Sequence, residues 1–174
     1  GTMARRGRDS LTDPLTGLGN RRNFYNYYNI AVLGSAGRKH VFSLAVADID
    51  HFKNINDTYG HEFGDRVLCH VSDILRGQCR ESDRLFRWGG EEFLVLMPKT
   101  ASDDAGLVLE RMRRKIQETP YVCEDGEKIF LTASFGLHAG VAEENLEGQI
   151  AMADQNLYEA KRDGRNRVVG PGVV

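Results

Sequence analysis

The stretch LFRWGGEEFLVLM, residues 85–97, lies near the middle of the chain and specifies a pair of strands. Two apolar segments, Leu85–Trp88 and Glu92–Met97, flank the pair Gly89-Gly90. Glycine tolerates the positive φ angles of a tight turn, so we expect these segments to form a β-hairpin. Because Glu91 and its neighbour follow the glycines directly, the sequence predicts a hairpin with two carboxylates at its tip.

A second apolar run, VFSLAVA at residues 41–47, precedes the acidic sequence Asp48-Ile49-Asp50. The run shows little polar alternation, which is typical of a strand buried on both faces. Residues i and i+2 of an extended chain point to the same side, so we expect both aspartates at one edge of the sheet. If the hairpin lies next to this strand, Glu91 comes close to Asp48.

Carboxylates at the ends of two neighbouring strands suit divalent metal ions. Magnesium prefers carboxylates, water and substrate phosphates, and two metals between carboxylates are the usual arrangement for nucleotidyl transfer. A simpler interpretation is that Asp50 caps the next helix, Asp48 only ends a strand and the glutamates form a solvated hairpin tip. Two acidic clusters in this arrangement favour the metal site.

The remaining pattern alternates helices with short strands. Helices are predicted near residues 21–33, 51–56, 63–75, 105–116 and 146–157, with a loop at 57–61 and a stop near Gly164, and strands at Tyr121–Cys123, Lys128–His138 and Arg167–Val169. The order β, helices, ββ, α, β, α, β predicts an α/β (α+β) fold. Its simplest form is a ferredoxin-like sheet of mainly antiparallel strands with helices on one face.

The composition excludes several classes of protein. The chain has 174 residues, 41% hydrophobic and 28% charged, as in one soluble globular domain rather than a disordered chain. A net charge of −2 argues against a nucleic-acid binder, and no apolar run approaches the roughly 20 residues that span a bilayer. Three cysteines without CxxC spacing support neither a disulfide framework nor a zinc site, so we expect a reducing cytoplasm.

Four segments together resemble one family. WGGEEF at residues 88–93 resembles the signature of the GGDEF family of diguanylate cyclases, in its GGEEF form. DPLTGLGNRR at 13–22 resembles the family's wide turn, DIDHFKNINDTYGHEFGD at 48–65 its metal- and guanine-binding segment, and KRDGRN at 161–166 its phosphate-binding segment. The resemblance covers about residues 13–170, which is nearly the whole chain.

The resemblance divides the chain into a domain and two short ends. Residues 13–170 would form a GGDEF domain with a palm-type sheet. Residues 1–12 are expected to be a cloning remnant, Gly1-Thr2-Met3, followed by a polar, basic linker from a missing upstream sensor domain. Residues 171–174 would form a C-terminal tail.

The resemblance implies that two GTP molecules condense into cyclic di-GMP and two pyrophosphates. Asp48, the carbonyl of Ile49 and Glu91 would hold the catalytic Mg²⁺, with Mn²⁺ as the other metal that such oxygen ligands suit. Glu92 would lie beside the phosphates or a second metal, so Asp48, Glu91 and Glu92 are the candidate catalytic residues. Each domain would bind one GTP, and catalysis would then need a homodimer around a two-fold axis.

The resemblance also assigns contacts with the substrate. The candidate substrate-binding residues are Asn56, Asp65, Lys53, His61, Lys161 and Arg165. Asn56 and Asp65 would read guanine, whose N1–H and amino groups are donors, and the Lys and Arg side chains would neutralise the triphosphate. Lys161 and Arg165 are four apart and would share a helical face if the helix persists through both. By residue type alone, these positions would be an Asn-Asp turn, a helix cap and a solvated helix end.

A product-binding site is expected at Arg80-Glu81-Ser82-Asp83, an RxxD tetrapeptide separated from Gly89 by five residues. Arg80 would bind a phosphate or a guanine edge of cyclic di-GMP, and Asp83 would accept from guanine. Arg111 would add a contact from the neighbouring domain. Feedback inhibition would couple this site to the encounter of two active sites. In isolation, the tetrapeptide would be an ordinary charged helix-to-strand turn.

These observations predict a diguanylate cyclase domain that acts on GTP in the cytoplasm, without nucleic acid and without direct membrane contact. Missing upstream segments could still anchor the full-length protein in a membrane. Two alternatives stay open: a receptor that binds cyclic di-GMP without making it, and a GTP-binding regulatory module. The intact acidic site argues against a pure receptor.

Overall fold

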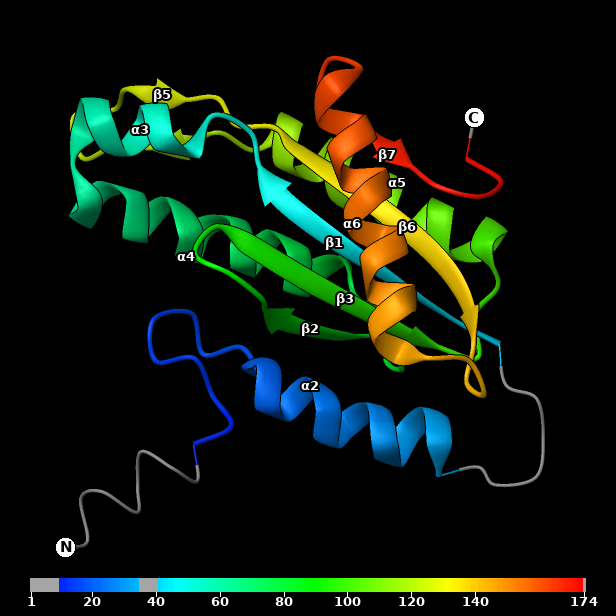
Figure 1. Cartoon of the computed structure of the whole chain (residues 1–174). Helices are drawn as coiled ribbons and strands as arrows, with labels where there is room; N and C mark the ends of the chain where they lie inside the picture. Colours follow the sequence, from blue (N-terminus) through cyan, green and yellow to red (C-terminus); the bar gives the residue numbers. More distant parts are fainter. Residues whose placement is uncertain (1–9, 35–40, 174) are drawn as a thin grey trace, which may run out of the picture.

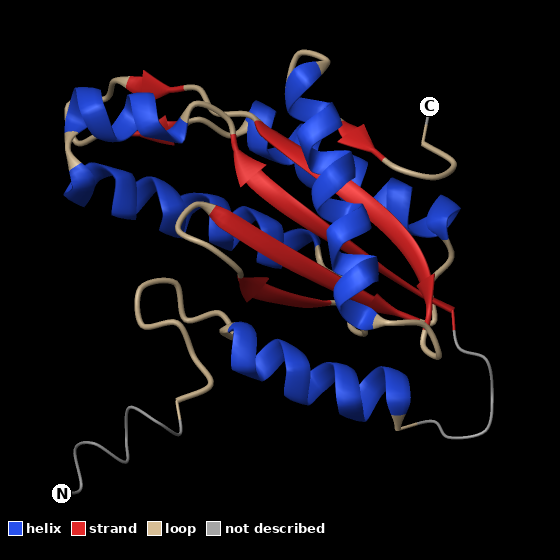
Figure 2. Ribbon diagram, in the orientation of Figure 1, coloured by secondary structure: helices blue, strands red, loops and turns tan. Residues whose placement is uncertain are grey.

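The computed structural model describes residues 10–34 and 41–173 (Figures 1 and 2). Its five-stranded sheet has the order β2-β3-β1-β6-β7, and all neighbouring strands are antiparallel except β6 and β7. The strands of this sheet are β1 (Val41–Ile49), β2 (Arg84–Arg87), β3 (Glu92–Pro98), β6 (Ala133–Val141) and β7 (Val168–Val169). The predicted α/β fold with a mainly antiparallel sheet is confirmed.

Helices cover both faces of this sheet. They are α2 (Arg21–Tyr28), which continues as the π-helix η1 (Asn29–Leu33), α3 (Phe52–Tyr59), α4 (His61–Gln78), α5 (Ser102–Glu118) and α6 (Leu146–Arg162). Helices α4 and α5 pack on one face, and α2 and α6 pack on the other (Figure 2). The prediction of helices on one face is wrong because β1 is buried on both sides. Ala45 and Ala47 belong to the α4–α5 core, whereas Leu44 and Val46 belong to the α2–α6 core.

Two element boundaries differ from the prediction. The expected strand Lys128–His138 is divided: β5 (Lys128–Ile129) pairs with β4 (Tyr121–Val122) in a separate ribbon, and β6 begins only at Ala133. The break occurs at Phe130, whose side chain is 74% exposed. The expected loop at 57–61 is reduced to Gly60, whose φ of 90° lets α3 pass into α4 through a single residue.

The hairpin of β2 and β3 forms as predicted, but its turn has a different geometry. Neither Gly89 nor Gly90 has a positive φ. The N–H groups of Trp88 and Gly89 both donate to the carbonyl of Glu92, at 2.8 and 3.2 Å. A Cβ at Gly89 would lie 3.1 Å from Glu92 Oε1. The glycine therefore leaves room for the Glu92 side chain to fold back over the turn.

The strand register brings acidic residues to one end of the sheet. Asp48 of β1 pairs with Glu92 of β3 on one side and with Ser134 of β6 on the other. The Ile49 N–H donates to the carbonyl of Glu91 at 3.4 Å. The predicted proximity of the hairpin tip to the end of β1 is therefore present.

The two ends of the chain differ in what the structure describes. Residues 1–9, which hold the expected cloning remnant and most of the linker, lie outside the described residues. In the expected tail, Val173 packs against the core beside α5. Within residues 10–34 and 41–173, no helix is both long enough and apolar enough to cross a membrane.

Candidate active site

A pocket of about 230 Å³ lies beyond the end of β1. Four segments contribute to it: the end of β1, the start of α3, the hairpin tip before β3, and the end of α6 with the turn that follows. Its lining residues are Asp48, Ile49, Asp50, His51, Phe52, Lys53, Asn54, Glu91, Lys161 and Arg165. The fold therefore gathers the candidate metal ligands and the candidate phosphate-binding residues around a single pocket.

Asp48 is a buried carboxylate in this pocket, with 5% of its surface exposed. Its Oδ2 accepts a hydrogen bond from Lys161 Nζ at 2.5 Å, which forms an ion pair between the end of β1 and the end of α6. Burial raises the pKa of Asp48, although the Lys161 ammonium acts in the opposite direction. One buried carboxylate is thus balanced by one cation.

Two glutamates at the hairpin tip add negative charge beside Asp48. Burial and the Asp48 carboxylate raise the pKa of Glu91, and the same two causes raise the pKa of Glu92. Like charges at partly buried positions disfavour ionisation unless a cation joins them. Together with the carbonyl of Ile49, these carboxylates form a set of hard oxygen donors, which fits Mg²⁺ or Mn²⁺.

Three cations line the same pocket, and the condition under which Lys161 and Arg165 would share a helical face, that the helix persists, is not met. Helix α6 ends at Arg162, and Arg165 follows in a turn with a left-handed φ of 65°. Arg165 and Lys161 nevertheless both line the pocket, and Lys53 reaches it from the first turn of α3. The turn, and not a continuing helix, brings the arginine there.

The candidate guanine-reading residues lie on successive helices. Asn56 is inside α3, and its Oδ1 is buried without a hydrogen-bond partner in the part of the chain that the structure describes. A Cβ at Gly64 of α4 would lie 1.8 Å from that oxygen, so the glycine leaves room for the Asn56 amide. Asp65, the next residue, lines a separate hollow of about 370 Å³, and the exposed His61 begins α4. Because Asn56 and Asp65 lie inside helices, the alternative turn and cap interpretations are wrong.

The candidate product-site residues lie around the connection from α4 to β2. Arg80 donates through Nε and Nη2 to the Asp83 carboxylate, at 3.0 and 2.8 Å, and Asp83 is only 3% exposed. Arg111 of α5 donates through Nη2 to the carbonyl of Gln78 at 3.1 Å. Arg111 therefore lies beside the residues that lead into the RxxD tetrapeptide.

Sequence reasoning missed the side chains that hold the hairpin tip. Arg87 donates to the carbonyls of both turn glycines, at 3.1 and 2.6 Å, and its Nη1 lies 3.1 Å from Asp13 Oδ2. Arg21 donates through Nε to the carbonyl of Trp88 at 2.8 Å. The Arg21 guanidinium also lies 4.1 Å from the centre of the Trp88 ring. The available signal was an arginine two residues before the glycine pair, together with the polar segment 13–22.

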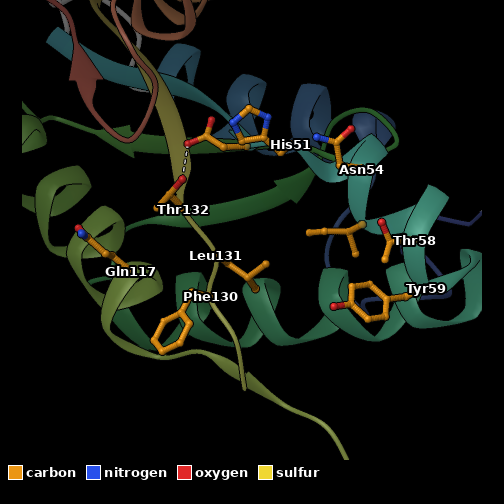
Figure 3. A pocket seen from close by; sticks show the side chains of 10 residues that line it. His51, Asn54, Thr58, Tyr59, Gln117, Phe130, Leu131 and Thr132 are labelled. Carbon is orange, nitrogen blue, oxygen red and sulfur yellow. Dashed lines mark hydrogen bonds between the residues drawn. The ribbon is translucent and has the colours of Figure 1, made fainter. Parts of the chain in front are cut away.

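A larger pocket of about 620 Å³ adjoins the first one and shares Asp50, His51 and Asn54 with it. Figure 3 shows His51 and Asn54 along one side and Phe130 and Tyr59 along the other. None of the candidate catalytic or substrate-binding residues lines this second pocket. The charged candidate residues therefore meet at the smaller pocket and not at the larger one.

Comparison with known proteins gives one consistent family. Residues 10–167 match the family described as "Diguanylate cyclase, GGDEF domain". The diguanylate cyclase DgcP of Pseudomonas aeruginosa is 43% identical over 159 residues, which are 91% of this chain and 24% of that protein. The diguanylate cyclase DgcM of Escherichia coli is 40% identical over 157 residues, which are 90% of this chain and 37% of that protein. The chain thus spans between about a quarter and two fifths of the length of these two relatives.

Solved structures share the fold. The GGDEF domain of DgcB from Caulobacter crescentus, in complex with c-di-GMP, has a TM-score of 0.83 and 34% identity, with 92% of this chain and 95% of that chain covered. The diguanylate cyclase SiaD from Pseudomonas aeruginosa, in complex with its activator SiaC, has a TM-score of 0.85 and 38% identity, with 97% and 66% covered. Both the family match and the identity extend over most of the chain, which therefore belongs to the GGDEF family of diguanylate cyclase domains.

Proposed function

We propose that this chain is a competent diguanylate cyclase domain, which condenses two GTP molecules into cyclic di-GMP and two pyrophosphates. The observation that carries the proposal is the 230 Å³ pocket, where Asp48 and Glu91 lie with three cationic side chains. A metal-bound triphosphate needs both kinds of group, because the metal binds carboxylates while Lys and Arg bind phosphate oxygens. A domain that only bound cyclic di-GMP at another site would have no use for this combination.

The oxygen donors at the end of β1 would bind the metal. Asp48, the carbonyl of Ile49 and Glu91 would hold Mg²⁺ or Mn²⁺, which when bound neutralises phosphate charge and lowers the pKa of an attacking hydroxyl. The raised pKa of Glu91 is consistent with this role, since a cation at that place favours the ionised carboxylate. Glu92, which folds back over the turn, would lie beside the phosphates.

The cations would bind and polarise the triphosphate. In each condensation, the ribose 3′-oxygen of one GTP attacks the α-phosphorus of the other, and the bond to the pyrophosphate oxygen breaks as the new bond forms. The hydroxyl proton passes to solvent. Lys53, Lys161 and Arg165 would offset the negative charge on the pyrophosphate as it departs. Lys161, which pairs with Asp48 in the structure, would then also contact phosphate.

Guanine would bind between α3 and α4. The Oδ1 of Asn56 is a buried acceptor without a donor among residues 10–34 and 41–173, and leaving such a group without a donor costs about 1–3 kcal/mol. The N1–H or amino group of guanine would supply that donor. Asp65 would accept from the same edge of the base, and His61 would add a hydrogen bond from the start of α4.

Two such domains would form a homodimer, because each binds one GTP and the reaction joins two. Arg80, Asp83 and Arg111 would bind the product and slow the enzyme, and Arg80 would exchange its Asp83 partner for phosphate or guanine. An upstream sensor domain would control the encounter in the cytoplasm. SiaD in complex with its activator SiaC supports control of a related domain by a partner.

The test is chromatographic analysis of products after the chain is incubated with GTP and Mg²⁺ at high protein concentration. We expect cyclic di-GMP from the parent and from Glu124→Gln, which changes an exposed glutamate that does not line the pocket. We expect none from Glu91→Gln. GDP, or no product from a chain that self-associates, would refute the cyclase and support a GTP-binding module or a cyclic di-GMP receptor. A monomer without activity would be tested again after fusion to a dimeric coiled coil.

A further inference from the structure

Asp50 lies two residues after Asp48, and its surroundings are different. Its carboxylate is buried, with 6% of the residue exposed. Oδ1 accepts a hydrogen bond from Ser134 Oγ at 2.7 Å, and Oδ2 accepts from Thr132 Oγ1 at 2.7 Å and from the Asn166 N–H at 3.0 Å. A buried charge requires such partners. The oxygens of Asp50 are therefore committed to protein donors.

The Asn166 N–H belongs to a turn with an unusual backbone. Gly164, Arg165 and Asn166 have φ angles of 122°, 65° and 48°. Asparagine adopts left-handed conformations more readily than most residues, but arginine does so rarely, and the conformation of Arg165 persists only where surrounding contacts impose it. Arg113 of α5 donates to Asn166 Oδ1 at 2.9 Å, and the Arg165 N–H donates to the last turn of α6 at 2.9 Å. The Asn166 N–H also donates to Ser134 Oγ of β6 at 3.2 Å. The turn is thus held from α5, from α6 and, through Asp50 and Ser134, from the sheet.

This turn determines where the Arg165 side chain lies. Arg165 lines the pocket together with Lys53 and Lys161, although α6 has ended three residues earlier. We propose that Asp50 is a positioning residue: by binding the Asn166 N–H, it holds the left-handed turn that presents Arg165 to the triphosphate. The inference rests on the proposed function, since the triphosphate is that of GTP. Asp48 would then bind the metal, whereas Asp50 would position the turn that carries Arg165.

The chemistry of residue 50 predicts a graded response to substitution. In Asp50→Asn, the amide oxygen can accept from Asn166 and Thr132, and the amide nitrogen can donate to Ser134, because a hydroxyl accepts as well as donates. In Asp50→Ala, the Asn166 N–H loses its 3.0 Å hydrogen bond and keeps the 3.2 Å contact with Ser134 Oγ, so the turn is held less firmly on the sheet. The asparagine variant should therefore rescue what the alanine variant loses.

The experiment measures binding of 3′-deoxy-GTP with Mg²⁺ by calorimetry on the full chain, since this nucleotide has no 3′-hydroxyl and does not condense. We expect Asp50→Ala and Arg165→Ala each to weaken binding about tenfold to a hundredfold, as for the loss of one charge-assisted contact. The double variant should lose little more than either one, since both changes remove the same contact. Asp50→Asn should stay within about threefold of the parent.

A second measurement separates positioning from general loss of stability. Hydrogen exchange of the Asn166 amide should be faster in Asp50→Ala than in the parent, without nucleotide. The matched control is Gln149→Ala, which removes another buried polar side chain, 3% exposed, that binds the backbone of Val141 and Glu144. Gln149→Ala should lower stability and leave both the Asn166 exchange and nucleotide affinity unchanged.

Several outcomes would overturn the proposal: Asn166 exchange unchanged in Asp50→Ala, faster exchange with parental affinity, or additive losses in the double variant. If Asp50→Ala does not fold, Ser134→Ala tests the same anchor, and exchange and affinity must change together. A self-associated or coiled-coil-fused parent chain that binds 3′-deoxy-GTP but makes no cyclic di-GMP from GTP would refute the proposed function alone, and the binding series would still decide the role of Asp50. A parent chain that binds no triphosphate would refute both.

Discussion

At the scale of single residues, the pocket holds more negative charge than its nearest cation balances. Burial raises the pKa of Asp48, and burial and the Asp48 charge raise those of Glu91 and Glu92. Among the described residues, Asp48 is the one carboxylate of this cluster that forms an ion pair, with Lys161. Such a cluster opposes folding when it is fully ionised and favours it when a cation is bound.

Replacement of Glu91 should therefore change how stability depends on pH. A carboxyl group whose pKa is raised by folding holds its proton more tightly in the folded state, so its contribution falls as the pH rises from the unfolded pKa through the folded one. Without metal, Glu91→Gln should be more stable than the parent at about pH 7, with the difference shrinking toward about pH 4. Thermal unfolding at several pH values, with and without Mg²⁺, measures this.

Mg²⁺ provides the control for that prediction. The ion should raise the Tm of the parent more than that of Glu91→Gln, because it binds the folded carboxylates. Glu124→Gln, at an exposed position, should follow the parent in every condition. A parent that gains stability over Glu91→Gln as the pH rises without metal would show that the pKa of Glu91 is not raised.

At the scale of elements, the packing of α3 against α4 depends on Gly64. A Cβ at this position would lie 1.8 Å from Asn56 Oδ1 and 3.2 Å from the ring of Phe52. The same helix contains Gly77, where a Cβ would meet no atom within 4 Å. The two glycines therefore form a matched pair, one at a close contact between helices and one on open surface.

Alanine should stabilise the protein at position 77 and weaken GTP binding at position 64. Gly77→Ala should raise the free energy of unfolding by about 0.5–1 kcal/mol, because alanine favours the helix, and leave GTP binding unchanged. Gly64→Ala should displace the Asn56 amide and weaken GTP binding by at least about tenfold, a loss of about 1.4 kcal/mol. Denaturant unfolding measures the free energy of unfolding of each variant, and calorimetry measures its GTP affinity. Parental GTP affinity in Gly64→Ala would argue against guanine binding beside Asn56.

Sequence patterns identified the elements where burial follows a simple period. The apolar run 41–47 indicated a strand buried on both faces, and this property already required helices on both sides of the sheet. The break at Phe130 could not be predicted from the sequence. The residues around it continue the apolar pattern of a strand, although the backbone leaves the sheet there. Periodicity reports which side chains are buried and not which neighbour a strand pairs with.

The same limit applied to the site. Motif segments placed Asp48, Glu91 and Lys161 near one another, as the structure does. The role of Asp50 and the ion pair that anchors Arg87 depend on contacts between residues 74 to 116 positions apart, in the Asp13–Arg87 and Asp50–Asn166 pairs. A pattern of neighbours along the chain cannot reveal such contacts, because each of these residues is an ordinary charged residue in its own segment.

At the scale of the whole molecule, the proposed reaction needs two copies of this chain. Each copy would hold one GTP and the groups that activate its α-phosphate, while the attacking hydroxyl would come from the GTP of the other copy. One pair of domains must therefore form two phosphodiester bonds, one at each site. A pair with one defective site can complete only the first bond, which yields a linear dinucleotide that keeps one 5′-triphosphate.

Mixing the parent with an excess of Glu91→Gln should therefore change the product and not only its amount. Most parent molecules would then meet a variant partner, so the linear dinucleotide should accumulate and cyclic di-GMP should fall more steeply than the parent fraction. Chromatography of the products at several mixing ratios measures this, and the same excess of Glu124→Gln should yield only cyclic di-GMP. If cyclic di-GMP instead falls only in proportion to the parent fraction, with no linear product, both bonds are formed by a single copy's metal site, and the two-site reaction is wrong.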